Sequence, residues 1–236
     1  MSAPRTARDR VRDEVTAEIL AVAAVHLARE GAAALSLRSI ARDLEMAPSA
    51  LYRYFSSRDA LLSALILGAY ESLAAAAQAA ASAVDAADAD ALARWSAVPN
   101  AMRAWALEHP HEWGLIFGSP VPGYEAPQAT VAPYVALAEA LVRPLKSAPD
   151  RAKRSPAARA TSRQDRALAD ALEPVTDGLL PGFAPSDVAA SLSAFAGLIG
   201  IISLEVFGHW RRTVLAPALL FDETVASMAR TLGVCP

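Results

Sequence analysis

The sequence predicts an all-α protein, and three observations support this fold class. The chain of 236 residues is 54% hydrophobic but only 6% aromatic, and much of its apolar content is alanine, a strong helix former and a poor strand former. Apolar residues recur at helical spacing along most of the chain. No segment alternates apolar and polar residues as a half-buried strand does. We therefore expect an N-terminal three-helix domain over residues 1–60 and a larger helical domain over residues 61–236.

The composition excludes several classes of protein. The single cysteine, Cys235, excludes an internal disulfide framework and a cysteine-rich zinc site. The charged N-terminus has no apolar run like that of a secretory signal. The longest uncharged apolar stretch, residues 192–204, is shorter than the about 20 residues that a membrane span needs. We therefore expect a cytoplasmic protein that has no membrane partner.

The net charge of −3 conceals an uneven distribution of charge along the chain. The first twelve residues contain more basic than acidic side chains: Arg5, Arg8, Arg10 and Arg12 against Asp9. These residues precede the first apolar helical pattern, so we expect a disordered basic arm over residues 2–12. A basic segment ahead of an acidic body indicates that nucleic acid binds at this end.

Four helices are expected in the N-terminal part, over residues 13–30, 37–44, 48–54 and from 58 to beyond 80. Gly31 ends the first helix, because glycine tolerates the left-handed backbone that closes a helix. Ser36 is expected to cap the second helix through its hydroxyl. Pro48 suits the first position of the third helix, where its missing N–H is no loss. Ser56 or Ser57 is expected to cap the fourth.

The remainder of the chain is also expected to be helical, in pieces that turns separate. The predicted helices span residues 95–109, 110–118, 128–145, 164–172, 186–210 and 217–232. Residues 118–127 are rich in proline and glycine, so they predict an irregular connection. Residues 147–163 are rich in Ala, Ser, Pro and Arg and show no apolar period, which predicts a flexible basic loop. Whether this loop contacts DNA is left open.

The second and third helices, with three residues between them, have the pattern of a helix-turn-helix. Their shared apolar positions, which hold the two helices at a steep angle, are Ile40, Ala41, Leu44, Met46 and Leu51. Two tyrosines beside an arginine then face outward from the third helix, where they suit phosphates and base edges. The candidate DNA contacts are Arg38, Ser39, Pro48, Ser49, Ala50, Tyr52, Arg53, Tyr54, Ser57 and Arg58. Two alternatives stay open. The two tyrosines could pack within the domain, and Arg38 and Arg58 could be solvated without contacting DNA.

Residues 19–65 resemble the DNA-binding domain of TetR-family transcriptional regulators. The most specific part is Ala-Leu-Tyr-Arg-Tyr-Phe at residues 50–55, followed by Ser-Arg-Asp at residues 57–59. The resemblance implies a homodimer that binds a palindromic operator in double-stranded DNA, most often as a repressor, and leaves it when a small-molecule effector binds the C-terminal domain. Glu45 stands where the family has glycine, which costs about 1–2 kcal/mol if the backbone there is left-handed. Ala47 replaces a serine that would cap the next helix.

The helical domain over residues 61–236 is expected to hold the effector. Residues 109–118 and 197–210 resemble one C-terminal subtype of the family, although Ile199 and Gly200 stand where that subtype has a His-Gly pair. The helices over residues 95–117 and 128–145 concentrate large apolar side chains, which predicts a largely apolar pocket formed mainly by them, with the helix over residues 195–207 behind it and part of the set serving as core. The candidate ligand-binding residues are Trp95, Met102, Trp105, Trp113, Phe117, Tyr134, Phe195 and Glu205. The charged candidates that could orient a hydrophobic ligand are Arg103, Glu108, Glu112, Glu139 and Glu205.

The last two predicted helices carry apolar stripes wider than a monomer comfortably exposes. We expect each subunit to contribute this pair of helices to a four-helix bundle in the dimer. The candidate interface residues are Phe195, Ile202, Phe221, Val225, Met228 and Leu232.

No pattern in the sequence indicates catalysis, a cofactor or a metal ion. His109 and His111 have no third ligand at helical spacing, and no nucleophile lies at a suitable spacing from a base. We therefore expect a regulator that is not an enzyme. Two alternatives stay open: a ligand-binding or enzymatic helical bundle that keeps this fold without binding an operator, and a transcriptional activator. The operator sequence, the effector and the regulated genes are not indicated.

Overall fold

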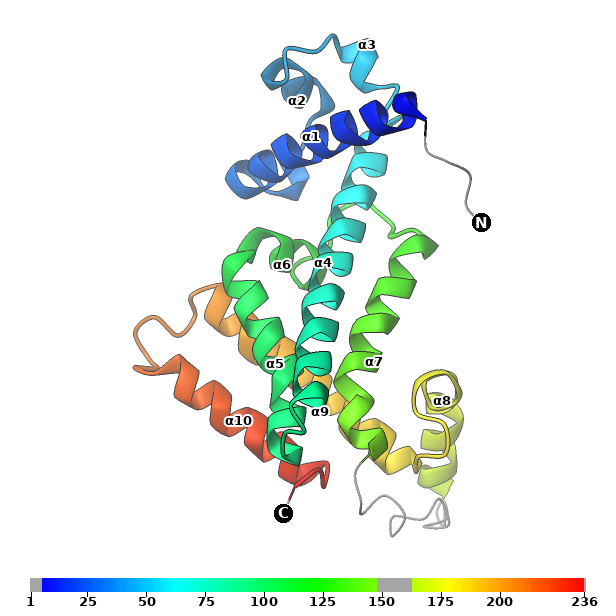
Figure 1. Cartoon of the computed structure of the whole chain (residues 1–236), viewed down its shortest axis with the longest axis vertical. Helices are drawn as coiled ribbons and strands as arrows, with labels where there is room; N and C mark the ends of the chain where they lie inside the picture. The colour runs from blue at the N-terminus through cyan, green and yellow to red at the C-terminus, as the bar shows by residue number, and fades with distance from the viewer. Residues whose placement is uncertain (1–5, 148–162, 236) are drawn as a thin grey trace. The chain divides into compact units, whose positions relative to one another are not determined.

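The computed structural model describes residues 6–147 and 163–235, and within these residues it is helical and contains no β-strand (Figure 1). The α-helices are α1 (Ala7–Glu30), α2 (Leu37–Asp43), α3 (Pro48–Leu51), α4 (Arg58–Ala86), α5 (Ala91–Glu108), α6 (Pro110–Phe117), α7 (Val131–Ser147), α8 (Arg163–Leu179), α9 (Pro185–Val206) and α10 (Pro217–Thr231). Two 3₁₀ turns, η1 (Ala32–Ala34) and η2 (Gln128–Thr130), complete the set. The predicted all-α class is confirmed. Arg5 and most of the expected basic loop lie outside the described residues.

The chain divides into two compact units. Unit 1 contains Met1–Tyr70 and His111–Thr130, and unit 2 contains Glu71–Pro110 and Val131–Pro236. This division differs from the predicted boundary at residue 60, because α4 starts in unit 1 and continues into unit 2 without a break. The apolar period of α4 is uninterrupted, so the sequence carries no local signal for the point where one unit ends.

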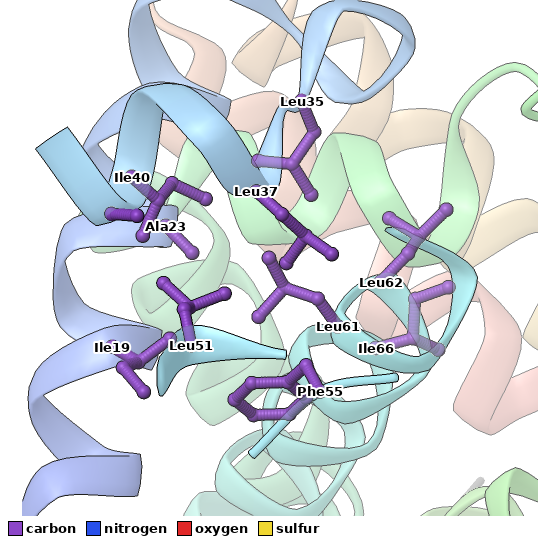
Figure 2. Close-up of a cluster of buried hydrophobic side chains, with 11 residues drawn as sticks. Ile19, Ala23, Leu35, Leu37, Ile40, Leu51, Phe55, Leu61, Leu62 and Ile66 are labelled. Carbon is purple, nitrogen blue, oxygen red and sulfur yellow. The ribbon is translucent and has the colours of Figure 1, made fainter. Parts of the chain in front are cut away.

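Unit 1 is organised around a core of buried aliphatic side chains (Figure 2). The residues in this core come from α1, α2, α3, the start of α4 and the connections before α2 and α4: Ile19, Ala23, Leu35, Leu37, Ile40, Ala41, Leu51, Phe55, Leu61, Leu62 and Ile66. Ile40, Ala41 and Leu51 are fully buried, as the helix-turn-helix pattern predicts. Leu44 and Met46 pack against the same core and are partly buried. Packing of this kind holds α3 against α1 and α2.

α1 begins earlier than the sequence analysis predicts, at Ala7 instead of residue 13. Thr6 and Asp9 form a capping box: the Thr6 hydroxyl accepts the N–H of Asp9 at 3.2 Å, and the Asp9 carboxylate accepts the N–H of Thr6 at 3.0 Å. This box satisfies two N–H groups that a helix start leaves unpaired. The expected disordered arm is therefore wrong from residue 7 onward, and Arg8, Arg10 and Arg12 lie on a helix.

Three other expected helix boundaries are confirmed, whereas the helix predicted to end at residue 210 ends at Val206. Gly31 closes α1 with a φ of 77°, Pro48 is the first residue of α3, and the Ser57 hydroxyl accepts the N–H of Ala60 at 3.1 Å at the start of α4. The expected cap at Ser36 is wrong, because its side chain makes no capping hydrogen bond. Its carbonyl accepts the hydroxyl of Ser39 at 2.9 Å instead.

In unit 2, α5 packs against α7, α9 and α10, and α8 packs against α7 and α9. Two tryptophans of α5 have buried indole rings, and each indole N–H donates a hydrogen bond. Trp95 donates to the carbonyl of Val225 on α10 at 2.9 Å, and Trp105 donates to the hydroxyl of Ser72 on α4 at 3.0 Å. α8 continues through Pro174 to Leu179, beyond the predicted end at residue 172, because the apolar side chains in its last turns pack on α7 and α9.

Two helices, α4 and α9, are long and apolar enough to cross a membrane by length and composition alone. Neither helix is expected from the length of the uncharged apolar runs alone, which are shorter than a membrane span. Both helices carry fully buried side chains, including Leu73 on α4 and Leu198 on α9. The same apolar character is needed by helices that build a core.

Candidate functional sites

The turn between α2 and α3 closes α2 through a left-handed residue. Glu45 has a φ of 53°, and Met46, which follows it, donates its N–H to the carbonyl of Ala41 at 2.8 Å. A bond of this kind closes a helix just after a left-handed residue. Glutamate therefore occupies the backbone conformation that favours glycine, at a cost of about 1–2 kcal/mol.

α3 is shorter than the predicted helix over residues 48–54. After Leu51 the chain continues as a tighter turn, in which Arg53 donates its N–H to the carbonyl of Ala50 at 3.2 Å. Leu51 is fully buried, so the opposite side of this segment faces outward. The side chains exposed there, which we call the recognition face, are Pro48, Ser49, Tyr52 and Arg53. Ala50 is partly buried between them.

Tyr54 does not face outward as expected, because it is partly buried against the core of unit 1. The guanidinium of Arg12 lies over its ring, 5.4 Å from the ring centre, and Arg12 also donates to the carbonyl of Arg53 at 3.5 Å. Arg8 lies one helical turn earlier, on the same side of α1. The basic end of α1 therefore lies beside the turn that follows α3. The Thr6 to Asp9 capping pattern is the sequence signal for the early start of α1, which places these arginines on a helix.

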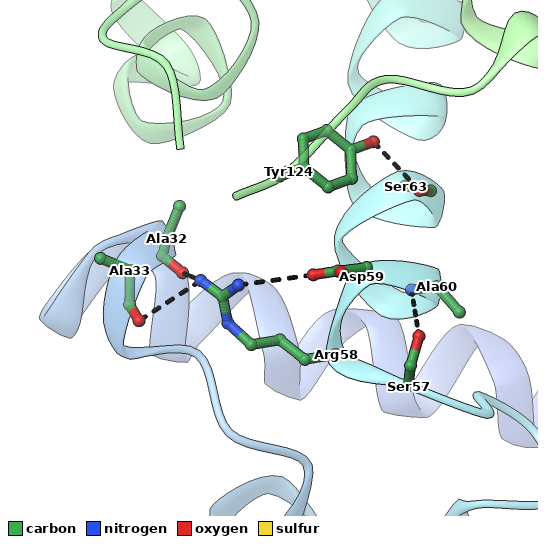
Figure 3. Close-up of polar contacts among 8 residues, drawn as sticks. All are labelled: Ala32, Ala33, Ser57, Arg58, Asp59, Ala60, Ser63 and Tyr124. Atoms are coloured by element: carbon green, nitrogen blue, oxygen red, sulfur yellow. Dashed lines mark hydrogen bonds and ion pairs between the residues drawn. The ribbon is translucent and has the colours of Figure 1, made fainter. Parts of the chain in front are cut away.

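Arg58, which was expected to contact phosphate, has a structural role within the protein (Figure 3). Its guanidinium donates to the carbonyls of Ala32 at 2.7 Å and Ala33 at 3.3 Å, and lies 3.5 Å from the Asp59 carboxylate. These bonds tie η1 to the first turn of α4. With its donors used in this way, Arg58 is a poor candidate for a phosphate contact.

Two candidate contacts lie at the start of α2. Arg38 is exposed, and it stays among the expected DNA contacts. Ser39 is partly buried and its hydroxyl donates to the carbonyl of Ser36, which gives it a local structural role. Among the expected DNA contacts, the exposed side chains are therefore Arg38, Ser57 and the recognition face.

Unit 2 contains an apolar cavity of about 240 Å³ between α7, α8 and α9. Its lining residues are Tyr134, Val135, Ala138, Leu141, Val142, Pro174, Val175, Gly178, Leu179, Leu180, Ser191, Leu192 and Phe195. None of these residues carries a formal charge. The rings of Tyr134 and Phe195 meet edge to face, with their centres 5.9 Å apart. Burial raises the pKa of Tyr134 above its usual value, so its hydroxyl stays protonated at neutral pH.

Only two of the expected ligand-binding residues, Tyr134 and Phe195, line this cavity. Trp95, Met102 and Trp105 are buried in the core of unit 2 instead. Trp113 and Phe117 belong to unit 1, where their rings pack with centres 4.5 Å apart. The predicted helix over residues 164–172 stops before the part of α8 that lines the cavity, because the full length of α8 depends on packing against helices that are distant in the sequence.

Glu205 is not a ligand-orienting group in this structure, because Arg103 already binds it. The Arg103 guanidinium donates to both oxygens of the Glu205 carboxylate, at 2.7 and 2.6 Å, and so joins α5 to α9. The guanidinium also lies over the ring of Phe221 on α10, 5.3 Å from its centre. Glu108, Glu112 and Glu139 are likewise absent from the residues that line the cavity.

The expected dimer residues are mostly buried within a single chain. Ile202 and Phe221 are fully buried, and Val225 and Leu232 are 1% and 8% exposed, so these side chains face the core of unit 2. Met228 is partly buried, and its methyl group lies close to Gly197 of α9. A shallow groove between α9 and α10 lies beside them, lined by small and polar residues that include Ser193, Thr224 and Ser227. Exposed apolar side chains elsewhere on α9, on α10 and in the connection between them include Leu204, Phe207, Leu219 and Leu220.

Comparisons with known proteins agree with this architecture. Residues 19–65 match the family described as bacterial regulatory proteins of the tetR family, and residues 95–228 match the tetracyclin repressor-like C-terminal domain. The helix-turn-helix-type transcriptional regulators Mb1846 of Mycobacterium bovis and Rv1816 of Mycobacterium tuberculosis are each 37% identical to this chain over 235 residues, with 94% of both chains covered. The solved structure of the regulatory protein SCO4313 is 33% identical, with a TM-score of 0.76 over 94% of this chain and 98% of that one.

Proposed function

The chain belongs to the TetR family of helix-turn-helix transcriptional regulators, and we propose that it acts as a homodimeric repressor. In this proposal the α3 segment of each subunit enters the major groove of a palindromic operator. A two-fold dimer presents these segments to half-sites about 34 Å apart, one turn of DNA or a spacing near it. A small effector bound in unit 2 releases the DNA. The protein works in the cytoplasm and catalyses no reaction.

The observation that carries the proposal is the recognition face on α3 and the turn after it. Tyr52 and Arg53 are exposed, while Leu51 on the opposite side is fully buried, so the exposed pair is presented from a firmly packed support. An arginine pairs with a guanine edge through two hydrogen bonds, and a tyrosine hydroxyl bonds to phosphate. We add Arg12 to the proposed contacts, because its place beside Arg53 suits the neighbouring phosphates.

The cavity between α7, α8 and α9 supports the proposed effector site. Its apolar wall favours a small uncharged molecule, and Tyr134 and Ser191 are the polar residues among those that line it. Ser191 donates its hydroxyl hydrogen to the carbonyl of Asp187 at 2.8 Å, so its oxygen can accept a bond from a ligand. An effector that releases DNA must bind the released form more tightly, and a hundredfold preference corresponds to about 2.7 kcal/mol.

The groove between α9 and α10 supports a revised dimer surface. Four exposed positions on α9, Ser193, Ala196, Gly200 and Leu204, recur at helical spacing and form one stripe. The small residues in this stripe allow a partner helix to approach closely, while Leu204 and Phe207 supply apolar area. This surface replaces the buried residues that the sequence analysis proposed for the interface.

Selection of bound duplexes from a random DNA pool tests the proposed function. We expect the full chain to enrich one palindromic site whose half-sites are separated by about one helical turn. Binding without any preferred sequence would contradict the proposal. Placing the selected site upstream of a reporter then distinguishes repression from activation.

A further inference from the structure

We infer that His26 is a positioning residue for DNA binding: from α1 it holds the carboxyl end of α2, and thereby the turn that directs α3. The inference rests on the proposed function, because it concerns how α3 is presented to DNA. His26 lies outside the helix-turn-helix and has no part in the recognition face. Two observations carry this role: one buried hydrogen bond between His26 and Asp43, and the missing side-chain cap of α3.

The contact is a hydrogen bond between a buried imidazole and a carboxylate. His26 is only 7% exposed, and its Nε2 lies 2.8 Å from an oxygen of Asp43. An ionised carboxylate only accepts hydrogen bonds, so Nε2 is the donor. The other ring nitrogen, Nδ1, is buried without a hydrogen-bond partner in the described structure, and the nearest carboxylate oxygen, on Glu30, is 3.9 Å away. Only Nε2 therefore connects the ring to another element.

Asp43 is the last residue of α2, where a negative charge opposes the helix dipole. Its position is therefore unfavourable for α2 alone, and a partner from another helix has to offset the cost. The hydrogen bond from His26 is the largest cause that lowers the pKa of the Asp43 carboxyl, which keeps it ionised. Arg42, the other charged group near this carboxylate, is mostly exposed and lies 3.5 Å from it.

Apolar packing of Leu51 holds α3, but its N-terminus has no side-chain cap. The helix consists of four residues, and its N-cap residue, Ala47, has no side chain that can cap it. Four residues, Leu44, Glu45, Met46 and Ala47, separate it from Asp43. Ile40 and Ala41 anchor the middle of α2 through apolar packing, whereas the bond from His26 anchors its end. Loss of that bond should let the end of α2 and the turn shift, and base contacts depend on geometry more strongly than phosphate attraction does.

The test measures affinity by fluorescence anisotropy for two duplexes, the site selected by the wild-type protein and a random sequence of equal length, at one salt concentration. We expect His26→Leu and Asp43→Ala each to weaken binding to the selected site about tenfold, with little change on the random duplex. The double variant should lose little more than either single variant, because both remove one bond. Asp43→Ala also removes a negative charge, which favours DNA, so a loss cannot come from charge.

Two further variants separate positioning from a general structural effect. His26→Gln should restore specific binding, because its amide nitrogen can donate to Asp43 as Nε2 does. Glu30→Gln should leave binding unchanged, because Glu30 is beyond hydrogen-bond distance from the ring. If His26→Leu fails to fold by circular dichroism, Asp43→Ala decides alone, since its side chain is 42% exposed and its truncation leaves no cavity.

The outcomes distinguish this inference from the proposed function. If the wild-type protein prefers no DNA sequence, the proposed function fails. If the wild-type protein binds its selected site, and folded Asp43→Ala and His26→Leu bind it equally tightly, the positioning role is overturned while the proposed function stands. A loss in His26→Gln as large as that in His26→Leu would also overturn the role assigned to the hydrogen bond.

Discussion

At the scale of single residues, Glu45 carries backbone strain that glycine would not. Its φ of 53° costs about 1–2 kcal/mol for a residue with a side chain, while glycine makes the unfolded chain more flexible at a cost of about 0.4–1 kcal/mol. We expect Glu45→Gly to raise the free energy of unfolding by about 0.5–1 kcal/mol, measured by urea denaturation. Glu45→Ala removes the same charge but keeps the strain, so it should bring no such gain. Equal stabilisation by both variants would point to charge as the cause.

Asp43 makes stability depend on pH in the acid range. The bond from His26 holds the pKa of this carboxyl below its usual value, which is about 3.9. A carboxyl with a lowered folded pKa adds stability above the unfolded pKa, and this stability is lost as the pH falls through the folded pKa. We therefore expect the free energy of unfolding to decline below about pH 4, and to decline less in Asp43→Asn. Identical acid profiles for both proteins would contradict this assignment.

At the scale of helices, features that depend on neighbouring residues can be predicted from the sequence, whereas features that depend on contacts between distant residues cannot. The apolar positions of the helix-turn-helix, such as Ile40 and Leu51, follow from a helical period within a few residues. The start of α1 depends on a Thr6–Asp9 pair that carries no apolar period. The role of Trp95 depends on the carbonyl of Val225, which lies far along the sequence. A concentration of aromatic residues therefore predicts a pocket, but it does not show which of these residues line the pocket and which belong to the core.

The cavity between α7, α8 and α9 yields a prediction at this scale. Ala138 lines it, so Ala138→Phe should fill part of the space that a ligand would occupy. We expect small uncharged aromatic compounds to raise the melting temperature of the wild-type protein and to lose that effect in Ala138→Phe. Ala104, exposed on α5, provides a matched control in Ala104→Phe. Undiminished stabilisation of Ala138→Phe by the same compounds would place their site elsewhere.

At the scale of the whole molecule, a substitution on the revised dimer surface should prevent dimerisation without unfolding the chain. Leu204 is 41% exposed on α9, so Leu204→Glu should give folded monomers in sedimentation velocity, with weak DNA binding because both half-sites are needed. Val225→Glu should instead unfold the chain, because it buries an unpaired charge. Leu92, which is 40% exposed on α5, serves as the control, and Leu92→Glu should remain dimeric. A fully dimeric Leu204→Glu would contradict this surface.

The central claim is that the recognition face reads the operator, and the affinity of Arg53→Ala for the selected duplex tests it most directly. Arg53 is exposed beside the fully buried Leu51, so the substitution should leave the fold and the dimer unchanged. We expect it to weaken specific binding by about 1–3 kcal/mol per half-site. Arg143→Ala, which removes an exposed arginine of α7 that pairs with Asp85, should bind like the wild-type protein. Wild-type affinity in a folded, dimeric Arg53→Ala would contradict the claim.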